Sequence, residues 1–263
     1  MVRVAKGLSM NVRPTVSRRP THRVARLSRR SRRLGQVLSC AAAIMLGTMS
    51  ARGQEAALAQ KLNNPVAAMI SVPFQFNYDG KIGLRDKGGR ATLNIQPVVP
   101  FSLNSDWNLI SRTILPVVSQ WDLGTGTGRQ FGLSDITQSL FLSPATPEPG
   151  GLIWGVGPVF RIPTASDELL GGSRGGAGPT AVVLKQAGPW TIGALANHIW
   201  SVGGATRGSA GPINMTFVQP FVSYTTADAW TFALNTEATY DWTNDKLTVP
   251  VNAVVSKLVK VGG

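Results

Sequence analysis

The stretch WTFALNTEATYD, residues 230–241, is the part of the sequence that most directly predicts the fold. It alternates with period two: one face carries Trp230, Phe232, Leu234, Thr236, Ala238 and Tyr240, and the other carries Thr231, Ala233, Asn235, Glu237, Thr239 and Asp241. Such alternation is typical of a β-strand with an apolar environment on one side and water on the other. The stretch is about twice as long as an average strand of a soluble protein and fits the roughly ten residues of a membrane-crossing strand.

The same alternation recurs along most of the chain, most clearly at residues 72–78 and 92–99. Counting such segments predicts ten strands, at 70–78, 90–100, 107–117, 132–143, 152–163, 179–186, 190–201, 213–224, 230–241 and 246–259. The connections after the first, third, fifth and seventh strands are long and rich in Gly, Asp, Arg or Ser, whereas those after the second, sixth and eighth are short. Long loops at one end and tight turns at the other are typical of a membrane barrel.

The aromatic residues lie at the ends of these predicted strands. We expect the interface girdles to contain Trp107, Trp154, Trp190, Trp200, Trp230, Tyr240 and Trp242. Four of these tryptophans open strands directly after the shorter turns, and all seven tryptophans of the chain avoid strand centres. Trp190 and Trp200 are ten residues apart and in phase, as are Trp230 and Tyr240. Ten residues span about 33 Å of strand, or about 25 Å of height at a tilt near 40°, which matches the apolar band of a barrel.

These patterns predict an all-β fold, an antiparallel up-and-down transmembrane β-barrel with about ten strands. A soluble β-sandwich or an enclosed soluble barrel is the alternative. In either of those folds, tryptophans belong in the core and strands are shorter.

The N-terminal part of the chain has the order of an export signal. A basic region that includes Arg29–Arg33 precedes a mostly apolar run from Val37 to Met49, and Ala51-Arg52-Gly53 provides small residues for cleavage. The apolar run is too short for the roughly twenty residues of a spanning helix. We therefore expect residues 1–53 to be a signal peptide with a long basic n-region, residues 54–64 a short periplasmic segment and residues 65–263 the barrel domain. The alternative is a basic arm that the mature protein keeps.

Charge and cysteine content narrow the function classes. Residues 1–53 hold 12 of the 26 Lys and Arg and no Asp or Glu, which leaves 14 basic against 13 acidic residues in the rest. A strand-rich region so close to neutrality lacks the basic footprint of a nucleic-acid-binding protein. The single cysteine, Cys40, lies in the predicted signal, so we expect no disulfide, no thiolate metal site and no cysteine nucleophile after export.

Several short stretches resemble a known group of proteins. They are NPVA at 64–67, ISVPFQFNY at 70–78, LNIQPVVPF at 93–101, WNLISRT at 107–113, WGVGP at 154–158 and LNTE at 234–237. They resemble proteobacterial outer-membrane barrels usually labelled as transporters, some of which carry the misnomer neuromedin U, and more distantly the barrel family of the phenol meta-cleavage pathway. The resemblance implies a Gram-negative outer-membrane location and passive transport. Members of that group continue for another hairpin, so twelve strands would be expected with it and about ten without it.

The polar face of the strands is the predicted functional surface. We expect Gln75, Asn94, Gln96, Arg112, Arg161, Asn235, Glu237 and Asp241 to face the lumen. Their mixed charges fit either a polar channel of modest selectivity or an internally paired plug of side chains. We therefore expect passive passage of an unidentified small solute. A closed barrel with a structural or surface-interaction role is the alternative.

An enzymatic function is the third hypothesis. His198 is the only histidine beyond residue 53, and a membrane-embedded lipid hydrolase would need a serine such as Ser223 beside it. An interfacial histidine is the commoner meaning of such a residue, and we expect no enzyme. The acidic pairs Asp167-Glu168 and Asp241 with Asp245 lack the ordered spacing of a calcium loop. We therefore expect no metal and no cofactor, and outer-membrane lipid as the partner; the sequence does not give the oligomeric state.

Overall fold

The structure of the protein is a computed structural model, and it describes residues 6–10 and 54–258 apart from residues 84, 125, 173 and 206–210. The predicted apolar run, Cys40 and the cleavage site all lie outside the described residues.

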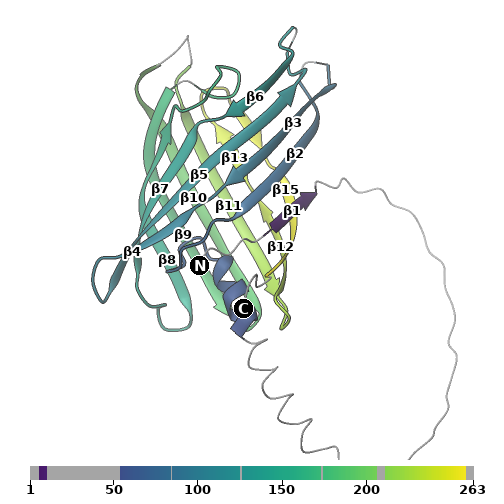
Figure 1. Cartoon of the computed structure of the whole chain (residues 1–263). Coiled ribbons are helices and arrows are strands. Elements are labelled where there is room, and N and C mark those ends of the chain that lie inside the picture. The colour runs from purple at the N-terminus through teal and green to yellow at the C-terminus, as the bar shows by residue number, and fades with distance from the viewer. Residues whose placement is uncertain are drawn as a thin grey trace, which may run out of the picture.

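Strands dominate the described chain. They are β1 (Lys6–Met10), β2 (Phe74–Ile82), β3 (Gly88–Ile95), β4 (Val98–Ser102), β5 (Trp107–Trp121), β6 (Arg129–Leu133), β7 (Ile136–Pro144), β8 (Leu152–Ile162), β9 (Arg174–Ala187), β10 (Trp190–Ala205), β11 (Asn214–Thr225), β12 (Trp230–Thr236), β13 (Ala238–Asp241), β14 (Lys246–Thr248) and β15 (Val251–Lys257). Residues 54–62 form a helix. The predicted all-β, antiparallel up-and-down fold is confirmed, and Figure 1 shows the strands tilted around a barrel-like sheet.

All ten predicted strands are present, although four of them are divided. The predicted strand 90–100 is β3 and β4, 132–143 is β6 and β7, 230–241 is β12 and β13, and 246–259 is β14 and β15. Two of the breaks contain a proline, Pro97 and Pro250, whose nitrogen cannot donate to a ladder. A third break falls on Glu237 alone.

The first predicted strand begins later than expected. It was predicted from residue 70, and β2 starts at Phe74, but residues 71–73 continue the same antiparallel register: Ser71 bridges Val98, and the carbonyl of Pro73 accepts a hydrogen bond from the backbone amide of Gln96 at 2.9 Å. Phe74 lines the interior, whereas simple alternation places it on the outer face with Phe76.

The antiparallel pairing runs in the order β2, β3, β5, β7, β8, β9, β10 and β11, and the short strands β4 and β6 each pair with β5. The last strand, β15, pairs antiparallel with β12. The strand β1 lies between β2 and β15: it pairs antiparallel with β15 over five residues and parallel with β2 over three. This seam is the one place in the described sheet where two neighbouring strands run parallel.

The two ends of the sheet differ. At the end that holds residues 103–106, 145–151, 188–189 and 226–229, called here the turn end, the connections are mostly tight. The opposite loop end includes residues 163–173, the longest connection, and also one short hairpin at 242–245. The predicted division into turns and loops holds only in part: the connections 163–173 and 206–213 are long, but the first, predicted to be long, is residues 83–87, because β2 and β3 extend beyond their predicted bounds, and the third, residues 122–128, is no longer than the middling turn 145–151.

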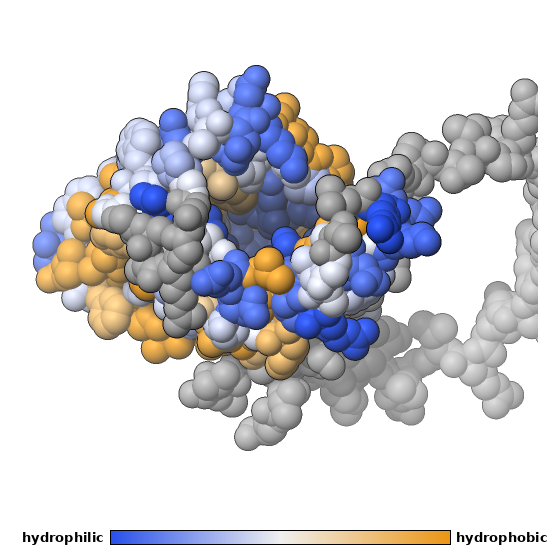
Figure 2. Space-filling view, turned by 90° about the horizontal axis from the view of Figure 1, so that it is seen from above, coloured by the Kyte–Doolittle hydropathy of each residue, from blue (hydrophilic) through white to orange (hydrophobic). Residues whose placement is uncertain are grey.

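The outer face of the sheet is apolar. Leu234 is 51 % exposed, Ile192 is 58 % exposed and Val156 is 46 % exposed, and all three are in phase with rim tryptophans. Because large apolar side chains are exposed to this extent on several strands, they form a continuous apolar surface rather than isolated exposed residues. Figure 2 shows hydrophobic residues on the outside and hydrophilic residues lining a hollow seen from the loop end.

Aromatic rings meet in pairs at both ends of this apolar surface. At the turn end Trp107 lies 5.8 Å from Trp154, and Trp190 lies 4.9 Å from Tyr224, as centroid distances. At the loop end the pairs are Tyr78 with Trp121, Tyr240 with Trp242, and His198 with Trp200. The structure thus brings the predicted girdle residues into two separate rims, and Lys257 lies 4.7 Å from the ring of Trp230 in the turn-end rim.

The interior is partly filled by the segment that directly precedes β2. Within this N-terminal segment, residues 54–73, Ala59 packs with Ala229 and Leu258 at the turn end. Gln60 donates to the carbonyl of Gly188 at 2.9 Å. Further on, Val66 is 4 % exposed and joins a core that includes Ile110 and Phe141. Residues 54–64, expected to be a short periplasmic piece, lie against the turn end of the sheet (Figure 1).

A glycine makes room for Val66 in this core. A Cβ at Gly155 would lie 3.3 Å from Cγ1 of Val66 and 3.2 Å from Cβ of Phe141. The bare backbone of β8 therefore lets the N-terminal segment approach the inner wall closely.

Candidate functional site

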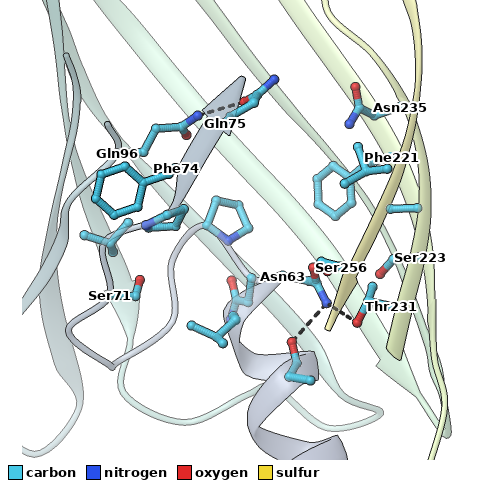
Figure 3. Close-up of a pocket in the computed structure, with 18 of the residues that line it drawn as sticks. Asn63, Ser71, Phe74, Gln75, Gln96, Phe221, Ser223, Thr231, Asn235 and Ser256 are labelled. Carbon is cyan, nitrogen blue, oxygen red and sulfur yellow. Dashed lines mark hydrogen bonds between the residues drawn. The ribbon is translucent and has the colours of Figure 1, made fainter. Parts of the chain in front are cut away.

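A cavity of about 260 Å³ lies inside the sheet, above the N-terminal segment. Its wall comes from β2, β5, β11, β12 and β15, and its base from the end of the helix. Figure 3 shows Phe74 and Phe221 on opposite sides, Gln75 and Gln96 at the upper edge and Asn63 at the base. Asn63 fixes the base, because its side-chain amide donates to the carbonyl of Ala59 at 3.0 Å and to the hydroxyl of Thr231 at 3.4 Å.

A chain of polar side chains crosses the upper part of this cavity. Arg112 donates to Oε1 of Gln96 at 2.8 Å, and Gln96 donates to Oε1 of Gln75 at 2.8 Å. Gln75 in turn donates to Oε1 of Glu237 at 3.4 Å, and Gln219 donates to the same oxygen at 3.2 Å. The chain therefore links β5 to β11 across the seam, through side chains that are far apart in the sequence.

Local backbone features position these groups. Gln96 falls in the gap between β3 and β4, just before Pro97, and Glu237 falls in the gap between β12 and β13. Gln75 and Arg112 lie within β2 and β5, on their inward phase. The register with the neighbouring strand continues unchanged across both gaps, from β3 to β4 along β5 and from β12 to β13 along β11.

Five of the eight predicted lumen residues line this cavity. They are Gln75, Gln96, Arg112, Asn235 and Glu237. Asn235 accepts a hydrogen bond from the side chain of Asn252 at 3.0 Å. Asn94 is the ladder partner of Gln75 but does not line the cavity.

Arg161 belongs to a different cluster, near the loop end. It forms an ion pair of 2.9 Å with Asp135, whose side chain is 2 % exposed. The same carboxylate accepts bonds from the amides of Gly172 at 2.7 Å and Ala165 at 3.2 Å. Of the two readings that the sequence left open for interior charge, this geometry fits the structural ion pair, because the pair ties the loop 163–173 to the sheet.

Asp241 lies apart from both clusters, at the start of the loop-end hairpin. Its carboxylate accepts from the backbone amide of Thr243 at 2.9 Å and from the side chain of Asn244 at 2.7 Å. The structure therefore uses Asp241 to hold a turn, and it lines no part of the cavity.

Sequence reasoning did not place Gln219 or Asp135 in the interior, and it named Ser223 only as a candidate hydrolase serine. Gln219 shares its inner face with Phe217 and Phe221, so the alternation along β11 gives no polar face there. Ser223 lines the cavity with its hydroxyl unpaired, and Asp135 lies in the gap between β6 and β7. Asp135 carried a signal, since an acidic residue between two apolar strands requires a partner.

His198 and Ser223, the pair that a lipid hydrolase would use, lie on opposite faces of the sheet. His198 is in phase with the outward Ile192 and Trp200, and its ring nitrogens contact Thr216 at 2.7 Å and Asn214 at 3.0 Å. Ser223 is buried opposite Thr191, at the other end of the same strand pair. The structure does not bring the two together.

Comparison of the chain with protein-family models, with curated proteins and with solved structures finds no match. Within the described residues, no helix is long and apolar enough to cross a membrane. The same residues contain no cluster of three or more His, Cys, Asp or Glu side chains that could hold a metal ion.

Proposed function

We propose that the protein is a Gram-negative outer-membrane barrel that lets small polar solutes cross passively. The observation that carries this proposal is one sheet with two unlike faces: an apolar outer surface bordered by two aromatic rims, and an inner cavity crossed by a polar chain. In a sheet of this kind, the backbone N–H and C=O groups of the paired strands are hydrogen-bonded to one another within lipid, and polar side chains face the interior. The family resemblance of the sequence supports the same reading.

The N-terminal segment makes this passage gated rather than free. The hollow is visible from the loop end in Figure 2, whereas residues 54–73 pack into the turn end through Ala59, Val66 and Asn63. A solute that enters at the loop end meets the polar chain first and the N-terminal segment next. Passage to the other side therefore requires this segment to move.

A closed barrel with a structural or surface-interaction role is the second candidate. The core of Val66, Ile110, Phe141, Leu184 and Leu195 favours it, because these side chains fill one side of the interior. The ion pair between Arg161 and Asp135, which ties a loop to the wall, favours it as well.

Single-channel recording in planar bilayers separates the two candidates. The full chain and the chain from Gln54 onward would be refolded in detergent, checked for β-sheet by circular dichroism, and added to the bilayer. The gated passage predicts discrete current steps with long closed periods. A folded and inserted protein that gives no steps at any voltage would refute passage and leave the closed barrel.

A further inference from the structure

Two opposite charges line the cavity without a direct ion pair between them. Arg112 and Glu237 both lie in its wall, whereas Arg161 forms an ion pair with Asp135. Between Arg112 and Glu237 stand Gln96 and Gln75, which relay hydrogen bonds from one to the other. An inner wall at low dielectric makes such a separated pair attractive to a ligand with complementary charges.

Both charged groups have bonding capacity left. A guanidinium has five N–H donors, and the bond recorded for Arg112 with the described residues is one donation to Gln96. Glu237 accepts two amide donors on Oε1 and none from a described residue on Oε2. Arg112 can therefore still meet a carboxylate, and Glu237 can still meet a cation.

A buried hydroxyl beside the cavity is also unpaired. Ser223 lines the cavity and is 3 % exposed, and its hydroxyl has no hydrogen-bond partner among the described residues; the hydroxyl of Thr236, outside the cavity, is unpaired as well. Buried hydroxyls in folded proteins are nearly always paired, with protein, water or ligand.

The remaining wall is mixed: polar residues such as Thr231 and Ser256 line it, as does Lys257, whose ammonium group lies 4.7 Å from the ring of Trp230, and one part is apolar. Phe74 and Phe221 lie on opposite sides of the cavity (Figure 3), and Val72, Pro73 and Val254 complete this part. The volume of about 260 Å³ is below the roughly 300–1,000 Å³ typical of sites for drug-sized ligands. The space therefore fits a molecule of the size of one amino acid rather than an oligosaccharide.

We propose that this cavity binds a small zwitterion with an apolar body, of the kind of an aromatic amino acid. Its carboxylate meets Arg112, its ammonium group meets Glu237, and its ring lies between Phe74 and Phe221. The role of this zwitterion as the transported solute rests on the proposed function, but the binding itself does not. Dianions are disfavoured by Glu237 and dications by Arg112, so the pair selects for balanced charge.

Three matched probes test the wild-type protein. Isothermal titration calorimetry on the detergent-solubilised full chain would compare phenylalanine with 3-phenylpropionate, which lacks the ammonium group, and with phenethylamine, which lacks the carboxylate. We expect phenylalanine to bind at least tenfold more tightly than either. Equal affinity for all three, or no binding of phenylalanine, would overturn the proposal without any variant.

Two variants assign the charges. Glu237→Gln keeps an acceptor for Gln75 and Gln219, and we expect it to weaken phenylalanine at least tenfold while 3-phenylpropionate changes little. Arg112→Gln should weaken both of these probes. The control is Arg90→Gln, since Arg90 also bonds a glutamine side chain, that of Gln120 at 3.0 Å, but lies outside the cavity. Unchanged phenylalanine affinity in a folded Glu237→Gln protein would refute the site; if Arg112→Gln does not fold, the probe series and Glu237→Gln still decide.

Recording in bilayers keeps this proposal distinct from the proposed function. Binding that follows the expected pattern in a protein without current steps would support the site and reject passage. Current steps in a protein that binds none of the probes would support passage and reject the site.

Discussion

The side chain of Val66 should control how often the barrel opens. It is 4 % exposed and packs from the N-terminal segment into the core of Ile110 and Phe141. Val66→Ala removes two methyl groups, which lowers the packing free energy of the segment by about 1.5–2 kcal/mol when transfer and cavity terms are added. Since about 1.4 kcal/mol is a factor of ten, the equilibrium constant for release of the segment should rise about 10- to 30-fold.

The assay is single-channel recording of the open fraction, with thermal unfolding measured in parallel. Val118→Ala is the matched control, because Val118 is 5 % exposed on the inner face of β5 and is not part of the core that holds Val66. We expect both variants to lose stability, but only Val66→Ala to open more often. If the two variants lowered the melting temperature equally and left the open fraction unchanged, the N-terminal segment would not be the gate.

Three further predictions concern the wall. Arg161→Ala leaves Asp135 buried with only backbone donors, so unfolding free energy should fall by about 2–3 kcal/mol in denaturant titrations; a changed ion selectivity at unchanged stability would contradict the structural reading. Leu234→Arg puts a charge midway between the rims and should lower the unfolding free energy in lipid vesicles by about 2–4 kcal/mol. The control Leu247→Arg, beside the loop-end hairpin, should change it by less than about 1 kcal/mol. Equal effects of the two variants would argue against a lipid-facing outer surface. Removal of residues 1–53 takes β1 out of the seam. Amide hydrogen exchange, measured by mass spectrometry, should then become faster in β2 and β15 but not in β8 or β9. Unchanged exchange in β2 and β15 would show that β1 does not protect these edges.

Much of the fold follows from local sequence because period two is a local property. The alternation in residues 230–241 predicts both the strand and its outward face, and Phe232 and Leu234 do lie outside while Asn235 lies inside. The girdle residues follow in the same way from their positions at strand ends. The alternation fails at Phe74, which lines the cavity together with its neighbour Gln75, and nothing local in the sequence marks this exception.

The lumen residues show where local reasoning ends. Alternation gives the face of a side chain but not its partner, so Arg161 and Arg112 look alike in the sequence. One is paired with Asp135, in a gap between strands, while the other keeps donors directed at a cavity. The sequence did not predict that Gln219 faces the lumen, because its neighbours on the inner face of β11 are aromatic.

The strands, their faces and the two rims follow from the amino-acid order, since each depends on residues a few positions apart, and the near-neutral charge of the strand-rich part follows from composition. The packing of distant segments places Val66 in the core and β1 in the seam, and it brings Arg112 and Glu237 to one cavity without a direct ion pair between them. The physical reason is that these arrangements join groups separated by tens to hundreds of residues. Their energies depend on the curvature of the sheet and on what fills its interior, which no local pattern encodes.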